Sequence, residues 1–386
     1  MKWRSSIAIA VTILIVIGFN GLPVSAADPS PQYELGDFTI PAATAEEPKR
    51  NSVSVPLALD YLEKGTQAWN GQKKCVTCHT NGIYMTIRPA LSDTFGKPTE
   101  SVRQFFVETL DRLEGLELKK LLQATQPAQV IYTAAGLAEW DKHVTKQLSP
   151  ETERALTLMF SIQRESGTWG TLDCWPPYES DAFHEATMAA MAVAAAPGWL
   201  AKIADTAVAT RVAQLMQYLR TEIPPHDYGR VLLLWASSRI PDLIDQERKS
   251  ELLELIFKHQ RDDGGWSIRT FADPEAWGNG NRAARLNAEP ELGNPPSDGH
   301  QTGLAIVVLR EAGVEAKDPR IQKAVAWLKS NQRASGRWWT KSLNTDSWHY
   351  ITYSGTAFPV LALSLCDAIP VETVTSLTDP RSLPRQ

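Results

Sequence analysis

Apolar residues recur along this chain at spacings of three and four, which is the period of one face of an α-helix. The clearest runs are Leu156, Met159 and Phe160; Leu252, Leu255 and Ile256; and Val325 and Leu328. After each run and a loop comes a segment rich in small residues, at about residues 181–194, 298–310 and 355–364, with a fourth at 228–237. No segment sustains the alternation of apolar and polar residues that is typical of a half-buried strand. The pattern predicts an all-α protein built from pairs of outer and inner helices.

One seven-residue motif follows three of the outer helices. It reads QRESGTW at residues 163–169, QRDDGGW at 260–266 and QRASGRW at 332–338. Glycine ends a helix readily because it accepts the left-handed conformation, while glutamine can bond the freed backbone groups and tryptophan can stack on a neighbouring helix. We therefore interpret the motif as a structural clamp and not as a catalytic element.

The same periodicity predicts helical pairs over the rest of the chain, which would make six hairpins in residues 55–368 and close an (α/α)6 toroid. The pairs are expected to start near Pro56, Glu100, Glu151, Thr206, Glu247 and Pro319. The motif resembles the QW repeats of the squalene-hopene cyclase and prenyltransferase superfamily, over residues 55–366. That resemblance implies a barrel with a central cavity, often for an isoprenoid. The DxDD acid of squalene-hopene cyclases does not occur here, and Asp262 and Asp263 lie inside a clamp, so polyene cyclisation is not expected.

The residues Cys75-Val-Thr-Cys78-His79 have the spacing of a c-type haem attachment site. Two thiols can add to the vinyl groups of a porphyrin while the adjacent imidazole of His79 ligates the iron. A disulfide or a zinc ion at Cys75 and Cys78 is the alternative, although a zinc knuckle would normally show a second CxxC. Gln72 precedes Cys78 by the interval that separates glutamine from tryptophan in the clamps. The sequence therefore predicts that the first hairpin (55–95) carries haem c in place of a clamp, at the rim or outer face of the barrel.

The N-terminus supports a location outside the cytoplasm. Lys2 and Arg4 precede an apolar run at residues 7–19 and small residues at 24–26, which predicts a cleavable signal peptide over residues 1–26 and a periplasmic or secreted protein. An uncleaved membrane anchor is the alternative, but the run is shorter than the roughly 20 residues that span a bilayer. Proline-containing residues 27–54 predict a flexible arm, and residues 369–386 a similar tail.

Composition narrows the possible partners. A net charge of −5 leaves no basic excess, so nucleic acid is not an expected partner. The four cysteines are too few, and Cys174 and Cys366 too far apart, to predict a disulfide framework. A redox partner protein and an apolar small molecule are the expected classes, and the sequence leaves membrane association open.

Four histidines precede or begin inner helices: His184, His226, His300 and His349. The segments around Asp298, His300 and His349 look like the zinc-ligand segments of protein prenyltransferase β subunits, with His300 standing where those have a cysteine. The resemblance implies a second site for Zn²⁺ or non-haem Fe²⁺, held by two histidines and a carboxylate. The alternative is that each residue caps or satisfies a helix end.

Three functions remain compatible with these features, and the sequence does not decide whether the protein is an enzyme. The first is electron transfer through covalently bound haem, for which Met85 and His143 can be named as sixth ligands, each with a structural alternative. The second is an enzyme or binder for an isoprenoid or other apolar ligand in a cavity lined by aromatic residues. The third is a noncatalytic interaction protein. Trp175, Tyr178, Trp235, Trp348 and Tyr353 are the candidate cavity aromatics.

Overall fold

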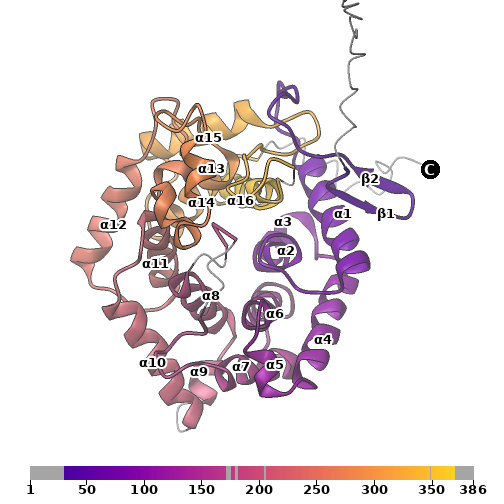
Figure 1. Cartoon of the computed structure of the whole chain (residues 1–386), viewed down its shortest axis with the longest axis vertical. Helices are drawn as coiled ribbons and strands as arrows, with labels where there is room; N and C mark the ends of the chain where they lie inside the picture. The colour runs from indigo at the N-terminus through magenta and orange to yellow at the C-terminus, as the bar shows by residue number, and fades with distance from the viewer. Residues whose placement is uncertain (1–29, 171–174, 179–180, 204–205, 348, 370–386) are drawn as a thin grey trace, which may run out of the picture.

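Two concentric rings of helices form the fold (Figure 1). The computed structural model describes residues 30–170, 175–178, 181–203, 206–347 and 349–369. The outer helices are α1 (Val55–Lys73), α4 (Glu100–Glu114), α7 (Pro150–Ser161), α10 (Ala207–Thr221), α12 (Gln246–Lys258) and α15 (Pro319–Asn331). The inner helices are α2 (Asn81–Ile87), α6 (Gln126–Trp140), α8 (Ala182–Ala195), α11 (Asp227–Arg239), α14 (Gly299–Glu311) and α16 (Ile351–Leu365). The described residues thus make six outer–inner pairs, and the predicted (α/α)6 toroid is confirmed.

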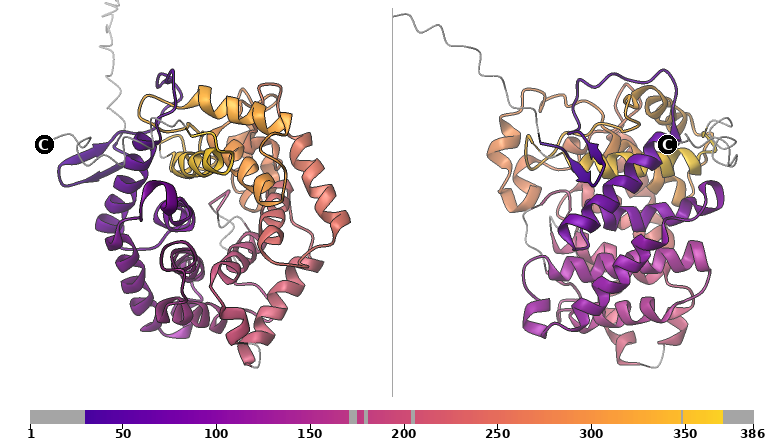
Figure 2. Two further views of the ribbon diagram at one scale, coloured as in Figure 1. Left: turned by 180° about the vertical axis from the view of Figure 1, so that it is seen from behind. Right: turned by 90° about the vertical axis from the view of Figure 1, so that its right-hand side faces the viewer.

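Shorter elements extend or connect these pairs. They are the helices α3 (Ser92–Phe95), α5 (Leu118–Leu121), α9 (Trp199–Lys202) and α13 (Ala283–Asn287), the 3-10 helices η1 (Arg88–Leu91), η3 (Ile268–Thr270) and η4 (Pro274–Gly280), and the π-helical turn η2 (Asp141–Thr145). The strands β1 (Tyr33–Leu35) and β2 (Phe38–Ile40) pair antiparallel beside the helical rings (Figure 2). Within the described part of the chain, no helix is both long enough and apolar enough to cross a membrane.

The two rings differ in burial, as their sequences predict. The outer helix α12 buries Leu252 and Ile256 on one face, whereas nearly every residue of the inner helix α14 is buried. Small residues let the inner helices approach closely. A Cβ atom added at Gly303 of α14 would lie 2.5 Å from the backbone nitrogen of Pro359 in α16.

Each of the three clamps ties the outer helix before it to the next outer helix. In each clamp the tryptophan Nε1 donates a hydrogen bond to a carbonyl of the preceding outer helix, at 2.7 Å for Trp169 and Trp266 and 2.8 Å for Trp338. The clamp glutamine donates to the carbonyl of the clamp glycine and to a second carbonyl near the N-terminal end of the following outer helix, which is that of Arg211, Arg320 or Ser54. For Gln332 that second acceptor is the carbonyl of Ser54, directly before α1, at 2.9 Å. The third clamp therefore closes the ring between the last outer helix and the first.

The inner helices all begin at one end of the barrel, which we call the mouth. Ring contacts join the first turns of α8, α11 and α14 there, because Tyr228 stacks on both His184 and His300, at 6.5 and 5.9 Å between ring centroids. The last turns of α6, α11 and α14 meet at the opposite end, where Arg239 forms ion pairs with Glu139 and Glu311.

The described part of the predicted arm, residues 30–54, is folded onto the barrel, which corrects the prediction of a flexible segment. Its hairpin turns at Gly36, whose φ of +54° suits a tight turn between strands. Tyr33 is 4% exposed, and the carbonyls of Pro41 and Pro48 accept hydrogen bonds from the third clamp. Prolines suggested an extended linker, but their carbonyls still pair with the clamp. The predicted signal peptide (1–26) and residues 370–386 of the predicted tail lie outside the described residues.

Candidate functional site

The CxxCH residues form a short loop between α1 and α2, at the mouth. Lys74 ends α1 in the left-handed conformation, with a φ of +54°. Asn81, the first residue of α2, then holds the loop: its Oδ1 accepts from the backbone of Thr77 at 2.8 Å, and its Nδ2 donates to the carbonyl of Cys75 at 3.0 Å and to Asn70 at 2.8 Å. Asn81 is fully buried. These hydrogen bonds give the loop a defined conformation.

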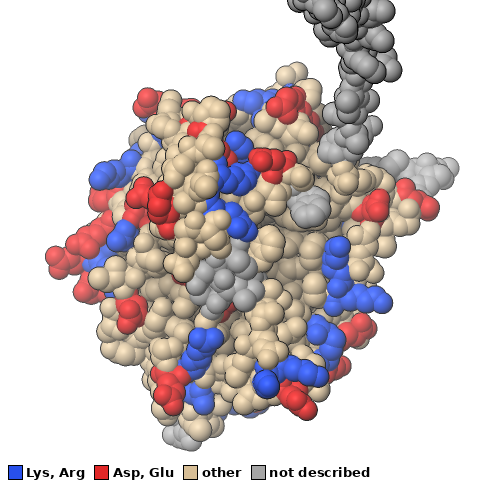
Figure 3. All heavy atoms as spheres, viewed as in Figure 1, with Lys and Arg blue, Asp and Glu red and all other residues tan. Residues whose placement is uncertain are grey.

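This loop forms one wall of a cavity of about 390 Å³, which we call the mouth cavity. The other walls come from segments that lead into α6, α8 and α16. Most of the lining is apolar or aromatic and includes Trp69, Val76, Trp175, Pro176, Tyr178, Tyr350 and Ile351, while Lys73, Gln129 and Asn344 add polar groups. In the space-filling view of this face, charged side chains of both signs surround a centre that is mostly tan or not described (Figure 3). The sequence predicted a haem site at the rim or outer face, and in the structure the side chains of Cys75, Cys78 and His79 line the mouth cavity, because the loop leads into an inner helix.

His79 is held by aromatic rings and one hydrogen bond. Its ring stacks on Tyr350, with centroids 4.9 Å apart, and meets the edge of Trp69 at 4.7 Å. Its Nδ1 is 2.9 Å from Oγ1 of Thr80. Burial lowers the pKa of His79 to about 4, so the imidazole is neutral near pH 7. A neutral imidazole bonded at one nitrogen and lining a cavity is the form that can ligate a metal through the other.

The two thiols of the loop both line the mouth cavity. Cys78 is buried, Cys75 is half-buried, and no disulfide joins them. Burial raises the pKa of Cys75, so it is a neutral thiol near pH 7. The side chain of Lys73 and the amide of Gln129, which is bonded to Arg112 at 3.1 Å, supply polar partners at the same cavity. A haem has a flat apolar body with carboxylates on one side. The two thiols and the imidazole fit its attachment and ligation, the apolar walls fit its body, and Lys73 and Gln129 offer polar partners for the carboxylates.

Neither residue named as a sixth ligand contributes to the lining described above. Met85 is fully buried in α2, and its Cβ lies 2.7 Å from where a Cβ on Gly136 of α6 would be. His143 follows α6 at the far end of the barrel, where its Nε2 lies 3.2 Å from Glu139. Met85 is a packing residue, and His143 belongs to the charged cluster at that end.

The second predicted site is not assembled. Both carboxylate oxygens of Asp298 accept backbone hydrogen bonds, from Gln301 at 2.9 Å and Ile268 at 2.7 Å, which makes Asp298 the N-cap of α14. His349 accepts at Nδ1 from the backbone of Ser342 at 3.0 Å, and its Nε2 lies 3.2 Å from the carbonyl of Asp346. Among the described residues, no group of three or more histidine, cysteine, aspartate or glutamate side chains is placed to hold a metal ion. The capping alternative accounts for Asp298.

His300, the third residue of that set, belongs instead to a buried polar chain on the barrel axis. Its Nδ1 is 2.7 Å from Oγ of Ser354, and its Nε2 is 3.1 Å from the hydroxyl of Tyr228. Ser354 also bonds the hydroxyl of Tyr178, which lines the mouth cavity. Burial lowers the pKa of His300 to about 3, so it is neutral near pH 7.

The histidines at the helix entrances converge only in part. His184, His226 and His300 all lie beside Tyr228, at 6.5, 6.2 and 5.9 Å between ring centroids. His349 packs on Trp339 instead, at 4.4 Å.

Of the five candidate cavity aromatics, Trp175 and Tyr178 line the mouth cavity. Trp235 bonds Glu311 at the far end, Tyr353 is buried among Tyr33 and Tyr61, and residue 348 lies outside the described residues. Trp69, Tyr350 and Asn81 were not predicted. These three residues belong to no recognisable sequence motif. The one local signal is that Asn81, a polar residue, comes two positions after His79.

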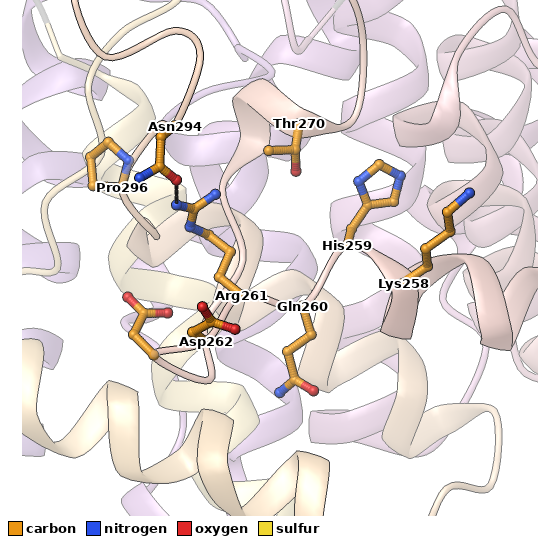
Figure 4. A pocket seen from close by; sticks show the side chains of 9 residues that line it. Lys258, His259, Gln260, Arg261, Asp262, Thr270, Asn294 and Pro296 are labelled. Carbon is orange, nitrogen blue, oxygen red and sulfur yellow. Dashed lines mark hydrogen bonds between the residues drawn. The ribbon is translucent and has the colours of Figure 1, made fainter.

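A larger surface groove of about 520 Å³ lies away from the motif, at the second clamp (Figure 4). Arg261 bonds Asn294 across it. Asp263, also in this groove, accepts from the backbone of Gly265 at 3.0 Å, from Ser297 at 2.7 Å and from Nε1 of Trp327 at 3.0 Å. Asp263 therefore serves the turn of the clamp, as the sequence predicted.

No family model and no curated protein matches the chain. In fold the chain resembles terpene cyclases. The ent-copalyl diphosphate synthase from Streptomyces platensis is 14% identical at a TM-score of 0.45, over 76% of this chain and 52% of that one. The type II terpene cyclase MstE from Scytonema, in complex with geranylgeranyl dihydroxybenzoate, is 10% identical at a TM-score of 0.43, over 81% of this chain and 97% of that one. This chain spans about half the length of the first of these proteins, and the similarities concern the fold alone.

Proposed function

We propose that this protein is an extracytoplasmic c-type haem protein that transfers electrons. In it, Cys75 and Cys78 would hold haem through thioethers in the mouth cavity, and His79 would ligate its iron. When bound, haem supplies one-electron redox chemistry. The observation that carries the proposal is that both thiols and a neutral imidazole line one apolar cavity.

The residues of the chain have separate roles in this proposal. Cys75 and Cys78 would hold the haem through two thioether bonds, each formed by addition of S–H across a vinyl group, which needs no oxidant. Asn81 fixes the backbone of the loop at Cys75 and Thr77, and Trp69 and Tyr350 exclude water from the ring of His79. The predicted signal peptide fits this chemistry, because haem is attached to such motifs outside the cytoplasm.

The experiment is expression of the full chain, with its leader, in a bacterium that carries the haem-maturation machinery. We expect haem stain to remain with the wild-type band on a denaturing gel, and the mature chain to begin near Ala27. The double variant Cys75→Ser/Cys78→Ser should lose the stain. Cys366→Ser is the matched control, since it removes a buried thiol at the end of α16, outside the described lining of the cavity. A wild type without stain, or a double variant that keeps it, overturns the proposal.

A second candidate, an apolar-ligand binder, is supported by the walls of the same cavity. Its volume of about 390 Å³ falls within the roughly 300–1,000 Å³ that is usual for small-molecule sites. Solvent extraction of the haem-free double variant, followed by mass spectrometry, tests this candidate. A stoichiometric apolar compound in the extract supports binding, and an empty extract together with haem-stained wild type leaves haem as the occupant.

A further inference from the structure

The N-terminal hairpin reaches the CxxCH loop through one hydroxyl group. The hydroxyl of Tyr33, in β1, lies 2.9 Å from Oγ1 of Thr80, and that oxygen lies 2.9 Å from Nδ1 of His79. Tyr33 and Thr80 are both buried, at 4% and 0% exposure. A continuous hydrogen-bonded chain therefore runs from the hairpin to the imidazole.

Several other contacts fix the hairpin, and with it Tyr33, against the barrel. Gln72 of α1 donates to the carbonyl of Glu34, and Arg337 of the third clamp donates to the carbonyl of Pro41 at 2.8 Å. Gly65 of α1 lets the ring of Tyr33 lie directly on the helix, because a Cβ there would be 3.2 Å from that ring. Tyr350, which stacks on His79, also contacts Tyr33, at 5.7 Å between centroids.

The chain has a definite direction once Nε2 of His79 binds a metal. Nδ1 must then carry the hydrogen and donate it, and Oγ1 of Thr80 is its acceptor. The hydroxyl hydrogen of Thr80 is then directed at the oxygen of Tyr33. Hydrogen bonds aligned in this way strengthen one another, so the tyrosine oxygen makes Thr80 a better acceptor and His79 a better electron donor.

We propose that Tyr33 is a positioning residue for the axial ligand, acting through Thr80 to fix the tautomer and the rotation of the His79 ring. The hairpin is then part of the haem site and not a peripheral arm. This inference rests on the proposed function, since it assigns the group that His79 ligates.

Tyr33→Phe tests the chain, because it keeps the packed ring and removes only the oxygen. Tyr61→Phe is the matched control: Tyr61 belongs to the same ring cluster, at 6.3 Å from Tyr33, and its hydroxyl is not part of the hydrogen-bonded chain from Tyr33 through Thr80 to His79. Thr80→Val removes the middle of the chain, and Thr80→Ser restores a hydroxyl there. All four are made in the full chain with haem attached, and the haem midpoint potential is measured beside the haem content.

We expect Tyr33→Phe to raise the midpoint potential with haem content unchanged, because a weaker donor ligand stabilises ferric iron less. Thr80→Val should raise it further, while Thr80→Ser and Tyr61→Phe should match the wild type. A wild-type potential in Tyr33→Phe overturns the inference, and so does an equal shift in Tyr61→Phe. If Tyr33→Phe does not fold, the Thr80 pair decides, and equal potentials in Thr80→Val and Thr80→Ser refute the chain. Loss of haem stain from the wild type would instead refute the proposed function, so the two failures are distinguishable.

Discussion

Asn81 gives the sharpest test of how the CxxCH loop is built. Its side chain makes three hydrogen bonds in a fully buried position, one of them to Asn70. At a net value of about 1 kcal/mol each, Asn81→Ala should cost about 3 kcal/mol of unfolding free energy. The backbone N–H of Thr77 is left without its acceptor, whereas the carbonyl of Cys75 keeps a second donor, Nε1 of Trp69 at 3.0 Å. The loss of unfolding free energy therefore comes mainly from the hydrogen bonds of the CxxCH loop.

The assay compares Asn81→Ala with Asn70→Ala by urea unfolding of the haem-free protein. Asn70→Ala removes one of the three bonds, so its expected cost is about 1 kcal/mol. A cost of about 3 kcal/mol is more than a hundredfold in an equilibrium constant. A loop loosened by that amount should also present its two thiols less well for haem attachment, so Asn81→Ala should carry less haem stain than the wild type on a denaturing gel. Equal losses in the two variants, or wild-type haem retention in Asn81→Ala, would refute the view that this side chain organises the loop.

Three further outcomes follow from the packing and charge of the barrel. Trp266→Phe should lower the urea unfolding free energy by about 1–3 kcal/mol, because the carbonyl of Ile256 loses one of its two donors and the smaller ring fills less of the buried space. Met85→Ala and His143→Ala should each leave the visible spectrum of the haem-loaded protein unchanged, and a changed spectrum would place that residue at the iron. Burial alone would raise the pKa of Glu139, but Arg239 and nearby cations bring it to about 2, below its ordinary value of 4.5. The stability that this lowered pKa contributes is present above the pKa of Glu139 in the unfolded chain and is lost as the pH falls from about 5 to about 2. In urea unfolding, the wild type should therefore lose more free energy of unfolding over that pH range than Glu139→Gln.

Local signals explain why the helical architecture could be predicted. The glycine of the clamp was expected to end its helix, but α12 already ends at Lys258, and Gly264 instead takes its φ of +90° in the turn of the clamp, whose residues act within a few positions of one another. The six predicted outer-helix starts fall within one residue of the observed ones. Periodicity and helix punctuation are both short-range properties, so one sequence was sufficient for them.

The hairpin and the cavity depend on contacts that no short window contains. The strands of residues 30–54 are three residues long, too short to show alternation, and Tyr33 is buried only because α1 and the CxxCH loop come to it. Gln72 matches the clamp spacing, but its side chain bonds the carbonyl of Glu34 in the hairpin, a contact that spacing along the chain does not reveal. The supposed metal triad failed for the same reason: spacing could align Asp298 with a ligand but could not reveal that two backbone N–H groups already use its carboxylate.

The aromatic rings that fill the barrel below the mouth cavity decide whether haem and an apolar ligand would compete for one site. Directly below the mouth cavity, Tyr178, Tyr228 and His300 are buried in mutual ring and hydrogen-bond contacts, and Phe358 packs edge-on against His300 at 5.3 Å. These rings occupy the space at the heads of the inner helices, so an apolar ligand entering from the mouth meets the same walls as a haem would. Haem and an apolar ligand are then alternatives for one site, and covalent attachment at Cys75 and Cys78 would decide between them, because a tethered group does not exchange with one that binds reversibly.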